Sequence, residues 1–247
     1  MAQSNFYGSW IVCGNTNTSF GPGVEVTIAP GLDLSTATVT IGVGSTQFEG
    51  TFEYEPTNDS LVASAGLPAG MAAMSISRYV DTTNNFYALY ALVVRSVDAV
   101  QQWPPLGSWV ARLDEQGTGR GMSVAPGSPS KFDGLYEVFA AGGVQFGFFS
   151  RVTLSNDGTN AKIENAFNQI VGESLTLTYD ATTASLDGSL TVAAPGGLPV
   201  PPMEYQIAIS RFSFFSQDHK REFVYGVTFV GDPEQAGTWG AETGGSG

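Results

Sequence analysis

The sequence of 247 residues contains an internal repeat that spans most of its length. Sliding the chain along itself by 126 positions places Phe6 on Phe132 and Val26–Ile28 on Val152–Leu154 without a gap. Further along, the offset drifts by a few residues, as it does when loops differ in length. The later matches pair short motifs: Gly66-Leu67-Pro68 with Gly197-Leu198-Pro199, Ile76-Ser77-Arg78-Tyr79 with Ile209-Ser210-Arg211-Phe212, and Gly107-Ser108-Trp109 with Gly237-Thr238-Trp239. The chain therefore contains one structural unit made twice.

The repeat predicts a first unit over residues 1–113 and a second over residues 132–247. Each is long enough to bury a hydrophobic core of its own. Between them, residues 114–131 are rich in Gly, Ser and Pro and have no apolar periodicity, which is typical of a linker.

Short runs of Val, Thr, Ile, Phe and Tyr between turn residues predict strands throughout both units. In residues 46–55, Phe48 and Phe52 fall on one face while Glu49 and Glu53 fall on the other. The predicted strands cover residues 6–13, 23–29, 36–43, 46–55, 60–64, 72–79, 86–94 and 107–112, then 133–140, 144–154, 161–168, 173–180, 185–192, 204–213, 222–230 and 237–242. We expect an all-β protein of two tandem antiparallel β-barrel units. Two β-sandwiches, or one larger sandwich shared by both units, are the alternatives.

The charge of the chain limits the partners that it can bind. Its formal net charge is −13, only ten residues are Lys or Arg, and charged residues make up 13% of the chain. Such a surface repels phosphate groups, so we expect neither nucleic acid nor an anionic membrane as a partner. The N-terminus lacks the basic and apolar regions of a signal peptide, so we expect a cytoplasmic protein. The oligomeric state stays open.

The residues that usually carry catalysis or bind metals are scarce. The one cysteine, Cys13, lies in an apolar stretch and is expected to be a small buried hydrophobe. The one histidine, His219, lies in a polar segment and has no equivalent in the first unit. We therefore expect no catalytic residue, no metal site and no cofactor.

An Ile-Ser-Arg-aromatic motif occurs once in each unit and contains Arg78 and Arg211. Strand alternation places Ile76 and Arg78 on the same face, so the guanidinium points inward if that face is the core. A buried arginine needs fixed acceptors, such as a carboxylate, a strand-end carbonyl or a ligand. A structural and a ligand-binding role both stay open.

Aromatic residues recur at equivalent places in the two units. With period 2 on strands they fit a core, but they also fit the lining of a barrel pocket. Trp103 differs, because it precedes Pro104-Pro105 in a loop, where it is suited to stack on a sugar or a hydrophobic ring. With the two arginines, these aromatics form the set of candidate ligand-binding residues: Trp10, Tyr54, Arg78, Tyr87, Trp103, Trp109, Tyr136, Tyr179, Arg211, Tyr225 and Trp239.

The motif Gly8-Ser9-Trp10 resembles the start of lipocalin- and avidin-like (calycin) barrels. The aromatic run Phe86–Leu92, followed by Gly107-Ser108-Trp109, is similar to the late strands of biotin-binding barrels. The resemblance implies a cup with a mouth, and a structural arginine beside the first-strand tryptophan. The second unit departs from the pattern, since it opens with Gly134-Leu135-Tyr136 and no tryptophan, so biotin is not implied.

These features predict a non-catalytic binding protein that holds a small hydrophobic or carbohydrate ligand in an aromatic-lined barrel pocket. The alternative is a cofactor-free cyclase or isomerase that folds a reactive substrate, as two-unit lipocalin-like cyclases do. A structural or self-assembling protein is a third possibility that fits the low charge.

Overall fold

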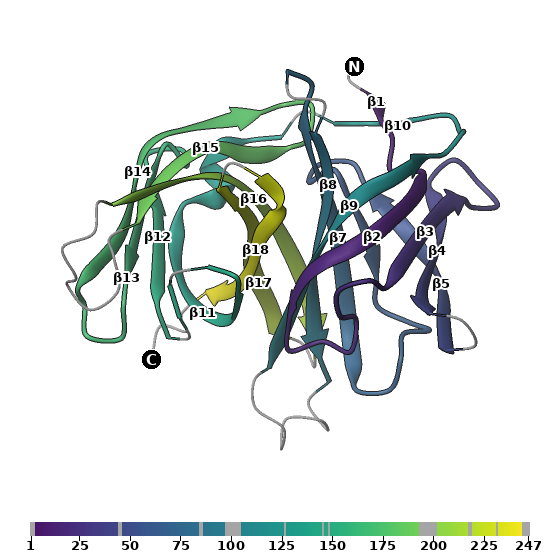
Figure 1. The fold of residues 1–247 in the computed structure, drawn as a ribbon, viewed down its shortest axis with the longest axis horizontal. Coiled ribbons are helices and arrows are strands. Elements are labelled where there is room, and N and C mark those ends of the chain that lie inside the picture. The colour runs from purple at the N-terminus through teal and green to yellow at the C-terminus, as the bar shows by residue number, and fades with distance from the viewer. Residues whose placement is uncertain are drawn as a thin grey trace.

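The computed structural model describes residues 3–43, 46–83, 86–96, 105–125, 127–144, 146–147, 149–192, 202–216, 219–230 and 232–243. They form two closed barrels of eight antiparallel strands each, in which strands adjacent in sequence pair with each other (Figure 1). The predicted tandem of barrels is confirmed, in place of two sandwiches or one shared sandwich. Across these ranges the one helical element is a 3-10 helix, η2 (Pro129–Phe132), and no helix is long and apolar enough to cross a bilayer.

Each barrel is an up-and-down meander closed between its first and last strands. The first consists of β2 (Gly8–Thr16), β3 (Glu25–Pro30), β4 (Thr36–Val43), β5 (Thr46–Glu55), β6 (Ser60–Ala63), β7 (Met71–Asp81), β8 (Phe86–Arg95) and β9 (Leu106–Gln116). The second consists of β11 (Gly134–Gly142), β12 (Arg151–Ser155), β13 (Asn160–Glu164), β14 (Ile170–Asp180), β15 (Ser185–Val192), β16 (Met203–Ser216), β17 (His219–Val230) and β18 (Asp232–Thr243).

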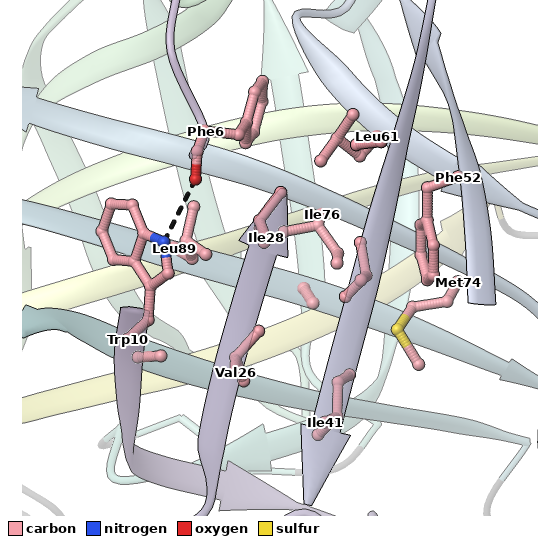
Figure 2. Close-up of a cluster of buried hydrophobic side chains, with 14 of the residues drawn as sticks. Phe6, Trp10, Val26, Ile28, Ile41, Phe52, Leu61, Met74, Ile76 and Leu89 are labelled. Atoms are coloured by element: carbon pink, nitrogen blue, oxygen red, sulfur yellow. Dashed lines mark hydrogen bonds between the residues drawn. The ribbon is translucent and has the colours of Figure 1, made fainter. Parts of the chain in front are cut away.

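Alternating side chains fill the interior of the first barrel. In β5, Phe52 is fully buried, while Glu49 and Glu53 are exposed on the outer face, as predicted. Figure 2 shows Ile28 and Ile76 among the side chains that converge between the strands. A comparable cluster fills the second barrel. Both interiors are therefore packed cores.

The segment before β12 differs from the prediction of a strand over residues 144–154. Only Arg151–Ser155 is a strand; the described residues between β11 and β12 lie in a loop, in which Gly143 has φ 68° and Phe149 has φ 60°. Phe146 in this loop is buried, and its ring meets the Trp239 ring edge-on at 5.7 Å. Phe146 thus caps the barrel from a loop, while Phe149 is exposed.

The segment 114–131, predicted as a linker, carries β-structure of its own. Strand β9 continues to Gln116, and β10 (Met122–Ser123) pairs with β1 (Gln3–Ser4) in a two-stranded sheet. Met122 and Val124 are buried, and the backbone N–H of Ala125 donates to the carbonyl of Pro56 at 2.9 Å. The connection is therefore tied to the first barrel by hydrogen bonds and burial.

The two barrels pack side by side through the outer faces of four strands each, β2, β7, β8 and β9 in the first and β11, β16, β17 and β18 in the second (Figure 1). The hydroxyl of Tyr90 is 2.7 Å from Oγ of Ser210, and the hydroxyl of Tyr225 is 2.8 Å from Oγ of Ser77. In each barrel the tyrosine is the cross-strand neighbour of the serine. These reciprocal contacts relate the barrels as a twofold axis would.

Candidate functional site

A cavity of about 390 Å³ lies at the mouth of the first barrel, where the β2–β3 loop meets the end of β4 and the start of β5. Among the described residues, its apolar lining includes Phe20, Val24, Ile41, Phe48 and Pro68. Ser19 and Gln47, both exposed, add polar groups at its rim. The described part of the lining therefore has a mostly apolar character, with side chains that do not ionise.

The mouth is shaped by a glycine inside β5. A Cβ atom on Gly50 would lie 2.6 Å from Cζ of Phe48, so the Phe48 ring folds back over the space that a side chain would fill. Phe48 and Ile41 are directly opposite in the β4–β5 ladder, and together they form one wall of the cavity. In the second barrel, the partner of Ile163 in the equivalent register is Gly172, so that mouth lacks the ring.

The opposite end of each barrel is closed by a matching hydrogen bond. Nε1 of Trp10 donates to the carbonyl of Phe6 at 3.1 Å (Figure 2), and the hydroxyl of Tyr136 donates to the carbonyl of Phe132 at 3.1 Å. Both aromatic rings are buried. The second unit has therefore replaced the tryptophan with a tyrosine that keeps the same bond.

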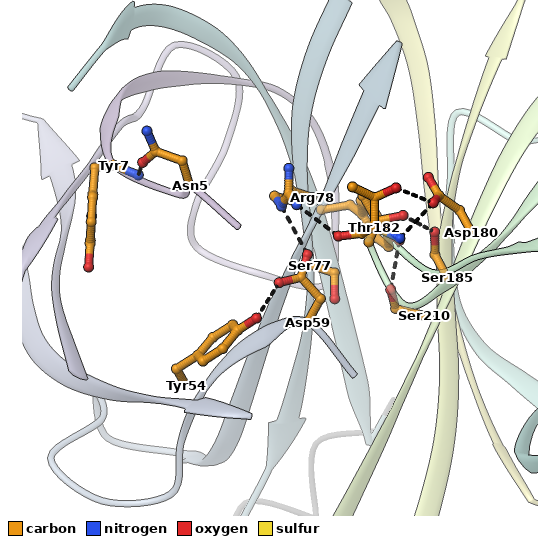
Figure 3. Close-up of polar contacts among 12 residues, drawn as sticks. Asn5, Tyr7, Tyr54, Asp59, Ser77, Arg78, Asp180, Thr182, Ser185 and Ser210 are labelled. Carbon is orange, nitrogen blue, oxygen red and sulfur yellow. Dashed lines mark hydrogen bonds and ion pairs between the residues drawn. The ribbon is translucent and has the colours of Figure 1, made fainter. Parts of the chain in front are cut away.

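Arg78 lies at this closed end and points inward, as the alternation of its strand predicted. Its Nε is 2.9 Å from Oδ2 of the buried Asp59, whose Oδ1 accepts a 2.7 Å hydrogen bond from Tyr54 (Figure 3). An NH2 donor of Arg78 reaches the carbonyl of Thr182 in the second barrel at 3.0 Å. Its guanidinium carbon lies 6.0 Å from the centre of the Phe6 ring. These contacts give Arg78 a structural role at the junction of the barrels.

Arg211 occupies the equivalent position with a different partner. Ala184 replaces Asp59, and both residues have the left-handed backbone, with φ 50° and 43°. Arg211 instead pairs with Glu222 on the neighbouring strand β17 at 2.6 Å. Its buried Nε has no hydrogen-bond partner among the described residues. Both units thus have the arginine, but its carboxylate partner comes from a turn in the first barrel and from the neighbouring strand in the second.

The remaining candidate ligand-binding residues lie apart from the mouth cavity. Trp109 and Trp239 are fully buried, one in each barrel core, and neither indole N–H has a partner within the described ranges. Tyr225 is buried between the barrels, and Tyr87 packs partly buried against the first core. The ring of Tyr179 lies 6.4 Å from that of Phe132, and Trp103 lies outside the described residues.

The structure therefore brings together only a few of the candidates. Tyr54 and Arg211 line a common cleft between the barrels, and none of the described candidates lines the mouth cavity. The residues that do so were missed. Phe20 and Pro68 are loop residues, and loops lack a period that assigns a face. Val24, Ile41 and Phe48 lie in predicted strands, where alternation does not tell a core side chain from one that lines a cavity. The one available signal was the repeat, since Phe20-Gly21 matches Phe146-Gly147 and Gly66-Leu67-Pro68 has its own copy.

A second carboxyl, Asp187, lies partly buried on β15, close to the junction of the barrels. The pKa of Asp187 is raised to about 7, mainly by burial and further by the negative charge of Asp180. A 2.6 Å hydrogen bond from Oγ of Ser185 acts in the opposite direction and lowers the pKa. The folded protein therefore binds the proton of the Asp187 carboxyl more tightly than the unfolded chain does. The stability that this protonation contributes is complete near pH 4 and is lost as pH rises through 7.

Replacing Asp187 with asparagine should remove this pH dependence. We expect Asp187→Asn to be more stable than the parent by roughly 1–2 kcal/mol at pH 8, and equal to it near pH 4, in urea unfolding. Asp157→Asn, in an exposed turn, is the matched control and should leave the profile unchanged. A parent protein whose stability does not fall between pH 5 and 8 contradicts this assignment.

Comparison with known proteins adds no relative: no protein-family model matches the chain, and no curated protein matches it either. The similarity to calycin barrels thus stays a prediction. Within the described ranges, no group of three or more His, Cys, Asp or Glu side chains is arranged to hold a metal ion.

Proposed function

We propose that this protein binds a small apolar molecule in the mouth of its first barrel. The observation that carries the proposal is the cavity of about 390 Å³, whose lining is dominated by Phe20, Val24, Ile41, Phe48 and Pro68. Burial of apolar ligand surface against such a lining is favourable, and the rim groups at Ser19 and Gln47 suit one polar end of the ligand. Of the two ligand classes expected from the sequence, this lining favours the hydrophobic one over a carbohydrate.

Binding of 1-octanol, followed by calorimetry, tests the proposal. At about 0.8 kcal/mol per buried methylene, an octyl chain that buries all of its roughly seven methylenes in the cavity should bind with a Kd on the order of 0.1 mM. Methyl glucoside, which exposes hydroxyls along its whole edge, should not bind measurably, because the described lining offers few hydrogen-bond partners. Stronger binding of the glucoside than of the alcohol overturns the proposal.

The wall of the cavity can be altered through Gly50. In Gly50→Ala the new Cβ displaces the end of the Phe48 ring, which we expect to swing into the cavity at little cost in stability. The octanol Kd should rise about fivefold or more. Gly172→Ala is the control with the same chemical change: its Cβ would meet neighbours at 3.5 Å, an ordinary contact, so octanol binding should be unaffected. Equal affinities in the two variants would place the ligand elsewhere.

A further inference from the structure

A second cavity, of about 330 Å³, lies between the two barrels and has charged side chains on both walls. Glu53, Tyr54 and Glu55 of the first barrel face it from one side. Lys131 of the 3-10 helix η2, with Arg211 and Phe212 of the second barrel, faces it from the other side. We call it the junction cleft.

The junction cleft exists because the twofold relation of the barrels is broken at one place. On one side, the turn at residues 180–185 of the second barrel meets Arg78, whose guanidinium donates to the carbonyl of Thr182 at 3.0 Å. On the equivalent side, the turn at residues 55–60 of the first barrel faces Arg211, but the guanidinium pairs with Glu222 of its own barrel. The contact that closes one junction is replaced at the other by a cavity.

The charges on the two walls are opposite. Lys131 is exposed, and Arg211 is held in place by Glu222 while its buried Nε lacks a partner among the described residues. Across the cleft, Glu53 is exposed, and Oε1 of Glu55 is fixed by the hydroxyl of Thr57 at 2.5 Å. A cation on one wall and a carboxylate on the other suit a molecule that carries both charges.

We propose that the junction cleft binds a small zwitterion with a carboxylate and an ammonium group, of the size of an amino acid or a dipeptide. Its carboxylate lies toward Lys131 and Arg211, and its ammonium lies toward Glu53 and Glu55. The aromatic side chain of Tyr54 flanks the space between them. Phosphates are disfavoured because the acidic wall repels them, and polyamines because the basic wall does.

Three related peptides test this charge requirement by saturation-transfer NMR and calorimetry. Glycylglycine carries both charges, N-acetylglycylglycine lacks the ammonium, and glycylglycinamide lacks the carboxylate. We expect glycylglycine to bind about fivefold more tightly than either analogue, with an affinity that weakens at high salt. Preference for one of the singly charged analogues, or no binding of any of the three, overturns the proposal.

Variants of exposed side chains locate the site without disturbing the fold. Lys131→Ala and Glu53→Gln should each weaken glycylglycine binding about three- to fivefold. The controls are Lys162→Ala, outside the cleft, and Glu49→Gln, on the same outer face of β5 as Glu53; both should bind as the parent does. Binding that survives both cleft variants contradicts the proposal. Octanol binding should be equal in all four, so failure at the cleft and failure at the mouth are distinguishable.

Discussion

Asp59→Ala is expected to lower the free energy of unfolding by about 3–5 kcal/mol, because it leaves the Arg78 guanidinium buried without its carboxylate. The variant also leaves the Tyr54 hydroxyl without the acceptor to which it donates at 2.7 Å. Backbone strain contributes little, since Ala184 adopts the same left-handed conformation at the equivalent place in the second barrel. Urea unfolding measured at neutral pH gives the difference directly.

The second barrel supplies the matched control for this prediction. Glu222 pairs with Arg211 through an NH2 nitrogen, and its side chain is 29% exposed, whereas that of Asp59, which pairs with Nε of Arg78, is fully buried. We expect Glu222→Ala to cost about 1 kcal/mol or less, since water replaces much of the interaction. If the two variants lose equal stability, the buried pair at Asp59 does not have the role described. The double variant Asp59→Ala/Arg78→Met should recover part of the loss, because it removes the uncompensated charge.

Gly226→Ala is expected to cost about 3 kcal/mol, since the added methyl has no room. Its Cβ would lie 2.6 Å from the carbonyl oxygen of Ala208 and 2.8 Å from the Trp239 ring. The carbonyl belongs to the paired strand β16, so the backbone itself must shift. Thermal and urea unfolding should both show the loss.

The equivalent site in the first barrel already contains an alanine. There Ala91 is the cross-strand partner of Trp109, as Gly226 is of Trp239, so an alanine is accommodated in that barrel. A Gly226→Ala variant as stable as the parent would show that Trp239 relaxes without cost, and would contradict the tight packing described for β17. Gly172→Ala, whose Cβ would make only ordinary contacts at 3.5 Å, should be close to neutral.

Much of the fold follows from the period-2 pattern and the repeat. Each of the sixteen predicted strands has a counterpart in the barrels, because a chain of short alternating strands with tight turns closes most simply into a meander. The β1–β10 pair was missed, since two-residue strands carry no period. The predicted start of β12 was wrong, because buried apolar residues such as Phe146 lie in the loop at the barrel end and not in the strand.

The faces of the central strands were harder to assign. In β8, Leu89 points into the first barrel and Tyr90 points toward the second, and both are fully buried. Alternation separates the two faces of such a strand, but it does not tell an inner face from one covered by another barrel. Tyr225, predicted to contact a ligand, lies between the barrels for this reason.

The sequence predicted the kind of acceptor that each arginine needs, but not which residue provides it. An inward Arg78 requires an acceptor, but nothing in the spacing singles out Asp59, which lies in a turn. The mouth cavity and the junction cleft depend on loop residues and on the packing of one barrel against the other. Neither the conformation of loops nor the packing of the two barrels produces a periodic pattern in the sequence.

Methyl-resolved NMR of the parent protein during titration with 1-octanol tests the mouth site most directly. Ile41 lines the cavity, and Ile163 is its counterpart in the second barrel, so the protein carries its own internal control. We expect the methyl signals of Ile41 and Val24 to shift in a saturable way while those of Ile163 stay in place. Shifts at Ile163 or at the exposed Ile170 with none at Ile41 would contradict the account.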